Sequence, residues 1–439
     1  MASLCELYRL FSEDTISSVI SYLPSYEHLT EQGRASLAKA DILIEQVLDL
    51  APAIDLKGVA AGARRHFVPL VAAGFLWPFA GPAHPKNAPT SFLPSGPYGN
   101  EVGDSYLNRL VLAGTDPADA FVRYSSLDVR KIVNLDRLFE IWIDRQRSRD
   151  EISGFRIADE IASHFRTEAL FRTPHHPNIR IFRSLATQLF EKLHVSPADT
   201  DRMTRSLSVS PFPYDALPIH PAVKDHFGLE FSRGDDRYPF LNEGSFTFHE
   251  YVSRYMTYEY NESLAEGIAI SEHGAPDRAE KLLMAGLLKS PTSAIGYLCL
   301  ARVRLKQDRL EDAVSMARQA AIYGEDNPYV FSLLGDLLGR TTDIGGAEFA
   351  LRRAIDLRPY QPYFADQLMA ILRRDGRLED IKPVIENIIH WLPYYDPPYH
   401  WLSSLLYQLN DTAAAEAAAL KGQALRTAVL QRDEERAVA

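Results

Sequence analysis

Cysteine is rare in this chain, since Cys5 and Cys299 are the only two among 439 residues. Two cysteines cannot form the disulfide framework of a small secreted protein. Positive charge is not in excess either, because the formal net charge is −11. Generic nucleic-acid binders carry basic surfaces, so this charge argues against that class. A hydrophobic content of 46% and a charged content of 24% are typical of a folded soluble protein.

Long apolar runs are also missing. The longest run, at residues 67–80, is interrupted by Pro69 and Pro78 and is shorter than the roughly 20 residues of a membrane span. The first residues, MASLCELYRLFSED, have no basic start and carry an early Glu6, which is unlike a signal peptide. These features predict a protein without a membrane span that stays in the cytoplasm.

No known nucleotide fingerprint occurs. The sequence has no G-x-G-x-x-G after a strand, no G-x-x-x-x-G-K-S/T and no G-x-S-x-G. We also predict no metal site. The adjacent pair His175 and His176 is a poor chelator because neighbouring side chains point apart, and no Cys or Asp/Glu cluster stands near it.

Residues 260–429 repeat with a period of 34 residues. Three positions of the period carry a small residue or a proline. They are filled by Gly267, Ala301 and Gly335, by Ala279, Ala313, Ala347 and Ala415, and by Pro291, Pro359 and Pro393. This is the register of tetratricopeptide repeats, and an irregular helical domain would not keep it through five units. We predict an all-α solenoid at 260–429 that binds a protein partner on its concave face, then a charged tail at 430–439.

The part before the repeats alternates between strand and helix patterns. Strands are predicted at residues 18–23, 41–47 and 67–75, and helices at 4–11, 30–40 and 54–65. This order predicts an α/β front domain at residues 1–259, with a small parallel sheet and many helices, followed by the repeat solenoid. Ligands of parallel sheets lie beyond the carboxyl ends of the strands. Those ends offer Ser25 and Tyr26, Glu45 and Gln46, and Trp77.

Residues 78–103 contain six prolines and four glycines, which excludes a helix or a central strand. A loop of this length is usually functional or disordered. Its aromatic residues and His84 favour an ordered, functional loop, which we expect to close over a ligand.

Several helices follow that loop. Asp104 is the expected cap of a helix at 105–113, Asp116 precedes Pro117 at a second helix start, and Asn134 caps a helix to about residue 149. Another helix is expected at 157–165. The residues Arg145, Arg147 and Arg149 form either an anion site or a solvated helix end, and we favour the solvated end.

The segment Phe-Arg-Thr-Pro-His-His-Pro-Asn at residues 171–178 precedes an amphipathic helix, with Pro177 expected at its start. His175 and His176 then lie just before a helix N-terminus, where backbone N–H groups and the helix dipole favour an anion. The alternative is a pair of capping histidines without a ligand. His220, within Pro-Ile-His-Pro, is expected to be structural.

Six short motifs in the front domain occur in a recognisable order. They are Ser25 with Tyr26, a strand ending in Gln46, a Phe-x-x-Pro loop with His84 and Pro85, Gly-Asp-x-Tyr-Leu at 103–107, the segment 171–178, and Pro-x-His-Pro at 218–221. In this order the chain resembles the WcbI-like capsular polysaccharide biosynthesis proteins over residues 5–258. The resemblance implies an α/β domain that binds coenzyme A (CoA) or acyl-CoA and takes part in acyl transfer to a surface polysaccharide.

The resemblance implies roles for individual residues. His175 or His176 is the expected general base, with His84 as a competitor, and Asn178 serves the oxyanion. Cys5 is a candidate nucleophile with a lowered thiol pKa at a helix N-terminus. CoA contacts are expected at Tyr26, Gln46, Tyr98, Tyr106 and Asn178. Where the family reads Gly-Asn-Cys-Gln after a strand, this sequence reads Ser-Leu-Cys-Glu at residues 3–6, with no strand before it.

Two functions are therefore open from the sequence. The first is a CoA-dependent acyltransferase that modifies a hydroxyl of a capsule-type glycan. The second is a non-catalytic repeat scaffold with a degenerate ligand-binding front domain.

Overall fold

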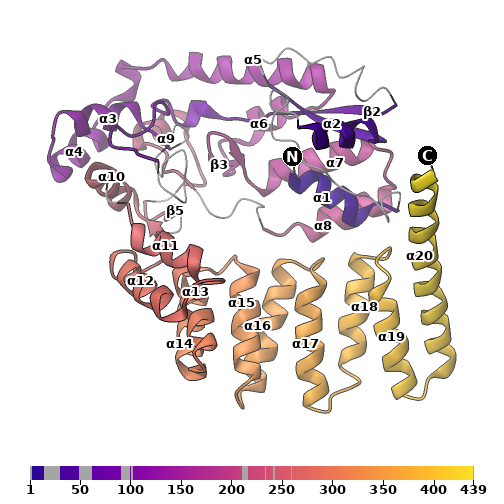
Figure 1. Cartoon of the computed structure of the whole chain (residues 1–439). Helices are drawn as coiled ribbons and strands as arrows, with labels where there is room; N and C mark the ends of the chain where they lie inside the picture. Colours follow the sequence, from indigo (N-terminus) through magenta and orange to yellow (C-terminus); the bar gives the residue numbers. More distant parts are fainter. Residues whose placement is uncertain are drawn as a thin grey trace.

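The computed structural model describes residues 2–13, 30–48, 62–89, 99, 102–209, 216–232, 234–240, 243–258 and 260–438. The front domain of helices and short strands lies along one side of a row of paired helices (Figure 1). The expected strand at residues 18–23 and the candidate residues Tyr26 and Tyr98 lie outside the described residues. The architecture is the predicted one: an α/β front domain followed by a helical solenoid.

A parallel strand pair begins the front domain. Strand β1 (Ile42–Val47) pairs with β2 (Arg64–Pro69), and Ile42 lies opposite Arg64. Helix α1 (Ala2–Phe11) and helix α2 (Glu31–Ala38), capped by Thr30, confirm the two expected helices. The strand predicted at 67–75 has the wrong bounds, because β2 ends at Pro69. The helix predicted at 54–65 is wrong at its end, because Arg64 and Arg65 belong to β2. Arg65 joins the strand because its guanidinium pairs with Glu45 on β1, with N–O distances of 2.7 and 2.9 Å.

The rest of the front domain is mainly helical. Its helices are η4 (Gly74–Leu76), α3 (Ser105–Leu112), α4 (Pro117–Ser125), η5 (Val129–Lys131), α5 (Leu135–Ser153), α6 (Ala158–His164), α7 (Ile179–Lys192), α8 (Pro197–Ser206), α9 (Pro221–Phe227) and α10 (Phe248–Thr257). Two antiparallel hairpins join them: β3 (Phe171–Thr173) with β4 (His176–Pro177), and β5 (Tyr238–Phe240) with β6 (Gly244–Phe246). The side chains of Asp104, Asp116 and Asn134 accept from backbone N–H groups as N-caps, as predicted.

An aromatic cluster forms the centre of this domain. The ring of Phe75, which is fully buried, lies 5.0 Å from Phe139, 5.2 Å from Phe165 and 5.8 Å from Phe227 between centroids. All three pairs meet edge to face, a favoured geometry for aromatic rings. Because the four residues come from four different segments, this cluster fixes η4, α5, the end of α6 and α9 to one another.

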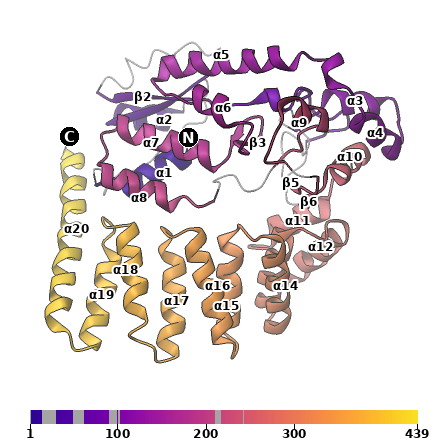
Figure 2. The same cartoon turned by 180° about the vertical axis from the view of Figure 1, so that it is seen from behind.

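Five helix pairs make up the solenoid (Figure 2). The first helices of the pairs are α11 (Glu262–Ile270), α13 (Ala294–Lys306), α15 (Pro328–Gly339), α17 (Pro362–Arg374) and α19 (Pro397–Gln408). The second helices are α12 (Pro276–Lys289), α14 (Leu310–Tyr323), α16 (Ile344–Leu357), α18 (Ile381–Trp391) and α20 (Thr412–Val438). Helix α20 continues through residues 430–438, which the sequence assigns to a charged tail.

The small residues of the repeat lie where the two helices of a pair touch. Ala313, Ala347 and Ala415 are fully buried. A Cβ atom at Gly335 would lie only 2.5 Å from Leu351 Cγ on the partner helix. A larger side chain at these positions would push the two helices apart, which confirms the physical reason for the repeat register.

We predict that Ala313→Trp lowers the free energy of unfolding by roughly 1–3 kcal/mol, because it overpacks the contact between α13 and α14. Thermal or urea unfolding of the full chain measures the loss. Ser315→Trp on the exposed side of α14 is the matched control and should change stability far less. An Ala313→Trp protein as stable as the wild type would show that the register is wrong.

One edge of the solenoid is docked on the front domain. The contacts are made by the turns between repeats, at the residue that follows the repeat-proline position. Tyr360 packs edge to face on Phe11 with centroids 5.7 Å apart, and Tyr394 Oη donates to Asp199 Oδ2 at 3.1 Å. Thr292 Oγ1 accepts a hydrogen bond from Ser245 N at 3.4 Å. Both views show the front domain along this edge (Figures 1 and 2), so the helix faces that line the solenoid are left uncovered by it.

Among the described residues, no helix combines the length and the apolar character that crossing a membrane requires.

Candidate functional site

Four of the motifs in the front domain are joined by hydrogen bonds. The hairpin β3–β4 lies at the carboxyl end of β2, where Ala73 N donates to Pro174 O at 2.9 Å. On its other side Leu217 N, which precedes the Pro-Ile-His-Pro motif, donates to Arg172 O at 2.8 Å. Residues more than a hundred positions apart are therefore brought together at the edge of the sheet where parallel-sheet proteins bind ligands.

The chain of hydrogen bonds continues through side chains. His220 Nε2 donates to Tyr124 O at 2.6 Å, and Tyr124 Oη donates to Asp104 Oδ2 at 2.5 Å. Asp104 N in turn donates to Tyr255 Oη at 2.9 Å, and Tyr255 Oη donates to Asn108 Oδ1 at 2.7 Å. This network links the loop before α9 to the start of α3 and to α10.

Asp104 is the titratable centre of this network. Burial raises the pKa of its carboxyl to about 6, although the Tyr124 hydroxyl and the N–H groups of Leu107 and Tyr106 favour the ionised form. The same burial raises the pKa of Tyr124 well above its ordinary value. The carboxyl pKa of Asp104 is therefore shifted toward the neutral range inside the domain, as occurs at functional sites.

We expect Asp104 to make stability fall as pH rises. Its pKa is about 6 in the folded chain and 3.8 when solvated. The folded state thus binds the proton more tightly, and this stabilisation, present below about pH 4, is lost as the pH rises through about 6. Asp104→Asn keeps a capping oxygen but cannot ionise, so its stability relative to wild type should rise by about 1–3 kcal/mol between pH 4 and 7.

Urea unfolding of both proteins at several pH values measures this difference. His84 and His220 titrate in both proteins, so their contributions cancel. A stability difference that does not change with pH would contradict the prediction.

A small cavity opens beside Asp104 and Tyr124. Its volume is about 30 Å³, and Trp77, His220 and Tyr251 also line it. Trp77 is 8% exposed, and its Nε1 has no hydrogen-bond partner among the described residues. A buried N–H donor without a partner is uncommon in folded proteins and indicates a position where a ligand or water oxygen binds.

His84 lies at the end of the network, in a structural setting. Its ring is buried, Nε2 donates to Tyr255 O at 3.1 Å, and Nδ1 accepts from Lys86 N at 3.1 Å. Burial lowers the pKa of the imidazole. The ring also stacks on Tyr258 with centroids 4.4 Å apart. A neutral ring held by two backbone groups fixes the loop to α10 and is a poor general base.

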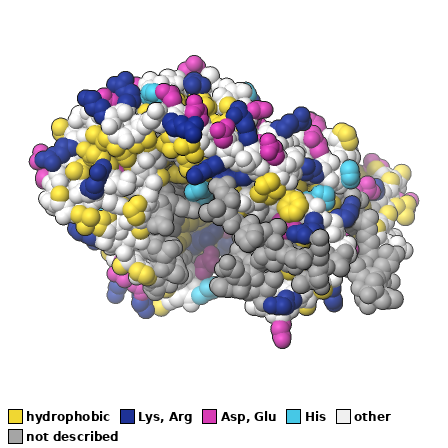
Figure 3. Space-filling model, turned by 90° about the horizontal axis from the view of Figure 1, so that it is seen from above, with side chains coloured by type: hydrophobic (Ala, Val, Ile, Leu, Met, Phe, Trp, Pro, Cys, Tyr) yellow, Lys and Arg dark blue, Asp and Glu magenta, His cyan; other side chains and the backbone are white. Residues whose placement is uncertain are grey.

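His175 and His176 lie at the turn of the β3–β4 hairpin, and both are half-buried. His176 Nδ1 lies 2.9 Å from Thr173 Oγ1, a hydroxyl that is itself buried. This contact orients the imidazole, as a base requires. Seen from above, the front domain is hollowed beside the residues drawn in grey (Figure 3).

The prediction that Pro177 starts a helix is wrong. Pro177 pairs with Phe171 in the hairpin, and the helix begins at Ile179. Asn178 is its N-cap: Oδ1 accepts from Ile179 N at 2.9 Å, while Nδ2 donates to Ala169 O at 2.9 Å. Asn178 thus secures the junction between hairpin and helix.

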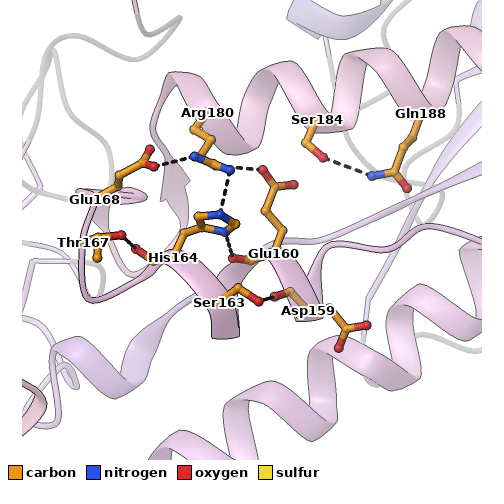
Figure 4. Close-up of polar contacts among 9 residues, drawn as sticks. All are labelled: Asp159, Glu160, Ser163, His164, Thr167, Glu168, Arg180, Ser184 and Gln188. Carbon is orange, nitrogen blue, oxygen red and sulfur yellow. Dashed lines mark hydrogen bonds and ion pairs between the residues drawn. The ribbon is translucent and has the colours of Figure 1, made fainter.

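The first turn of α7 carries a compact charge cluster (Figure 4). Arg180 is bound by Glu160 and Glu168, and its Nη2 lies 3.0 Å from His164 Nε2. His164 Nδ1 donates to Glu160 O at 3.0 Å. Because two carboxylates face one guanidinium, this turn is less attractive to an anion than the sequence alone suggests.

Cys5 differs from its expected state. It lies half-buried in the first turns of α1, and burial raises its thiol pKa, although the chain's amino terminus and a backbone hydrogen bond act in the opposite direction. The predicted lowering of this pKa is wrong because desolvation outweighs the helix terminus. The structure gives Cys5 no feature of an activated nucleophile.

The remaining candidates are spread around the site. Gln46 is exposed near the end of β1, and its neighbour Glu45 is buried against Arg65. The Tyr106 ring packs near Phe79 and Tyr124, at the Asp104 end of the network.

Arg149 is not part of a solvated helix end. It is 4% exposed, and its Nη1 donates to Leu70 O at 3.0 Å, just after β2. The expectation for this residue is wrong because its partner lies 79 positions away in sequence. Arg147 does remain at the surface, paired with Asp144.

A larger open pocket of about 620 Å³ lies between the α5–α6 turn and α7. Its lining carries both charge signs, from Arg147, Arg156 and Lys192 and from Glu151, Asp159 and Glu191. None of the residues of the hydrogen-bonded network lines it, so we place the candidate site at the network. The described residues contain no His, Cys, Asp and Glu group able to hold a metal ion.

Comparison with known families gives one match, which lies in the front domain. Residues 18–198 match the family model described as "Polysaccharide biosynthesis enzyme WcbI". This part of the chain is similar to the WcbI family. The matched segment includes the Asp104–Tyr124 pair and the β3–β4 hairpin but not Cys5.

Among curated proteins there is no match. Solved structures resemble the C-terminal part of the chain. A MamA protein matches with a TM-score of 0.34 and 16% identity over 38% of this chain and 94% of its own. YrrB, described as a TPR protein with an unusual peptide-binding site, matches with a TM-score of 0.32 and 16% identity over 39% of this chain and 90% of its own.

Proposed function

We propose that the chain acts in polysaccharide biosynthesis as a CoA-dependent acyltransferase. Its front domain binds CoA or acyl-CoA and transfers the acyl group to a hydroxyl of a capsule-type glycan, while the repeats bind a protein partner on their concave face. The observation that carries this proposal is the WcbI match over residues 18–198, which contain the hairpin histidines and the Asp104–Tyr124 pair.

The described residues fit CoA through their donors. Phosphate and amide oxygens of CoA are acceptors, and the site offers the two hairpin imidazoles as donors. The protein is acidic overall, so a polyanion needs such local donors for binding. Acyl-CoA, when bound, supplies an activated thioester.

His176 is the side chain best placed to act as a base. In the tautomer whose Nδ1–H donates to Thr173 Oγ1, Nε2 carries the lone pair that accepts the proton of the glycan hydroxyl. The hydroxyl oxygen then bonds to the acyl carbon, and the carbon–sulfur bond breaks. The imidazolium returns its proton to the departing sulfur, so His176 ends the cycle neutral. His175 is the second candidate for this role.

Two measurements on the full chain test the proposal. Calorimetry with CoA should show saturable binding. Incubation with acetyl-CoA and a capsule-type glycan should release one free thiol for each ester formed, detected with a thiol reagent and by mass spectrometry of the glycan. Absence of CoA binding would refute the proposal.

A second candidate is the non-catalytic scaffold. It is favoured by Cys5, whose thiol pKa is raised and which lies outside the WcbI match. In that case the full chain captures its protein partner through the repeats but releases no thiol from acyl-CoA. Thiol release at a rate that depends on His176 would reject the scaffold.

A further inference from the structure

The small cavity beside Asp104 has walls of a distinct character. Leu76, Phe79, Val102, Leu217 and Pro218 make most of its lining apolar. The polar groups that reach it are already engaged with the protein: Asp104 with Tyr124 and two backbone N–H groups, and His220 with Tyr124 O and Ala222 N. Trp77 also lines the cavity, and its buried Nε1 has no hydrogen-bond partner among the described residues.

The other polar side chains of the lining are engaged, so one donor beside several apolar walls suits a small group that has one oxygen acceptor and an apolar remainder. A charged group does not fit, because no cation lines the cavity to compensate it. The volume of about 30 Å³ limits the size of the group. Since a water takes roughly 10–15 Å³ on this scale, the chamber holds about two or three non-hydrogen atoms.

We infer that this cavity is the acyl subsite of the front domain and that it takes an acetyl group, with the carbonyl oxygen bound by Trp77 Nε1. The methyl group then lies against Phe79, Val102 and Leu217. Acyl groups of four or more carbons exceed the space. This inference rests on the proposed function for its ligand but concerns residues that the WcbI match does not assign.

Calorimetry on the full chain tests the subsite. Acetyl-CoA should bind about fivefold more tightly than CoA, as one added hydrogen bond in an apolar site provides, and butyryl-CoA should lose this gain. Trp77→Phe keeps the ring but removes the N–H, so it should bind acetyl-CoA and CoA equally. Val102→Phe fills the chamber, so this variant should also bind acetyl-CoA and CoA equally, with its affinity for CoA the same as that of the wild type.

The matched control is Trp391→Phe. Trp391 Nε1 donates to Asn387 Oδ1 in α18, in the solenoid, so this variant should keep the acetyl preference. Equal affinities of acetyl-CoA and CoA for the wild-type chain would overturn the inference, as would a Trp77→Phe variant that keeps the preference.

A second measurement does not need CoA to bind. The chain has four tryptophans, so a ¹⁵N-tryptophan sample should give four indole N–H signals, with the Trp77 signal identified by Trp77→Phe. S-acetyl-N-acetylcysteamine should shift that signal, and N-acetylcysteamine should not. If CoA fails to bind but the signal shifts, the proposed function fails and the subsite stands. No shift with the acetyl thioester would refute the subsite.

Discussion

Replacing both His175 and His176 with alanine weakens CoA binding by about 1.5–3 kcal/mol for each charge-assisted contact that is lost. The hairpin presents both imidazoles at the carboxyl end of β2, where each is available for a contact with bound CoA under the proposed function. The fold should survive, because α7 is held by the buried side chains of Phe182, Leu185 and Leu189. Calorimetry at matched ionic strength measures the change.

The control for this double variant is His273→Ala. His273 is 91% exposed in a turn of the first repeat, so its loss should leave CoA affinity unchanged. A double variant that binds CoA like the wild type would move the phosphate site to the strand end at Gln46.

Replacing Phe75 with alanine should lower the free energy of unfolding of the front domain by about 3–5 kcal/mol. Phe75 is fully buried and touches Phe139, Phe165 and Phe227, which belong to three different segments. Its removal leaves a cavity that these segments cannot fill without moving. Urea unfolding followed by near-ultraviolet circular dichroism reports this region because it is rich in aromatic rings.

Phe349→Ala is the matched control for Phe75→Ala. Phe349 is 73% exposed on α16, and its loss should change stability by less than about 0.5 kcal/mol. The two variants delete the same atoms, so the comparison isolates burial. A loss below about 1 kcal/mol for Phe75→Ala would mean that the cluster is not the centre of the core.

Local patterns were sufficient for the repeats and the helix caps. The positions of Ala313 and Gly335 follow from a period of 34, because each repeat touches mainly its neighbours. Asp104, Asp116 and Asn134 could be predicted as caps because a cap bonds N–H groups two or three residues away.

Long-range contacts set the features that the sequence did not predict. Arg149 is buried by a carbonyl far away in the chain, and nothing in its own helix indicates this. The strands of the β3–β4 hairpin are too short to show the two-residue alternation typical of a strand. The sequence therefore places Pro177 at the helix start, whereas it pairs with Phe171 in the hairpin. The hydrogen bond between Tyr124 and Asp104 likewise connects two helices. In the sequence only Asp104 is marked, because it belongs to the Gly-Asp-x-Tyr-Leu motif.

The docked edge of the solenoid has a mechanical consequence. A free repeat array is flexible along its length, because small rotations between neighbouring repeats add up to changes in pitch and curvature. Here the turns at Thr292, Tyr360 and Tyr394 are held by the front domain at three points along the same edge. Those contacts restrain the solenoid, so it cannot change its curvature without breaking at least one of them. A partner on the helix faces therefore meets a surface of fixed shape, and any partner that requires a different curvature must overcome the packing of Tyr360 on Phe11.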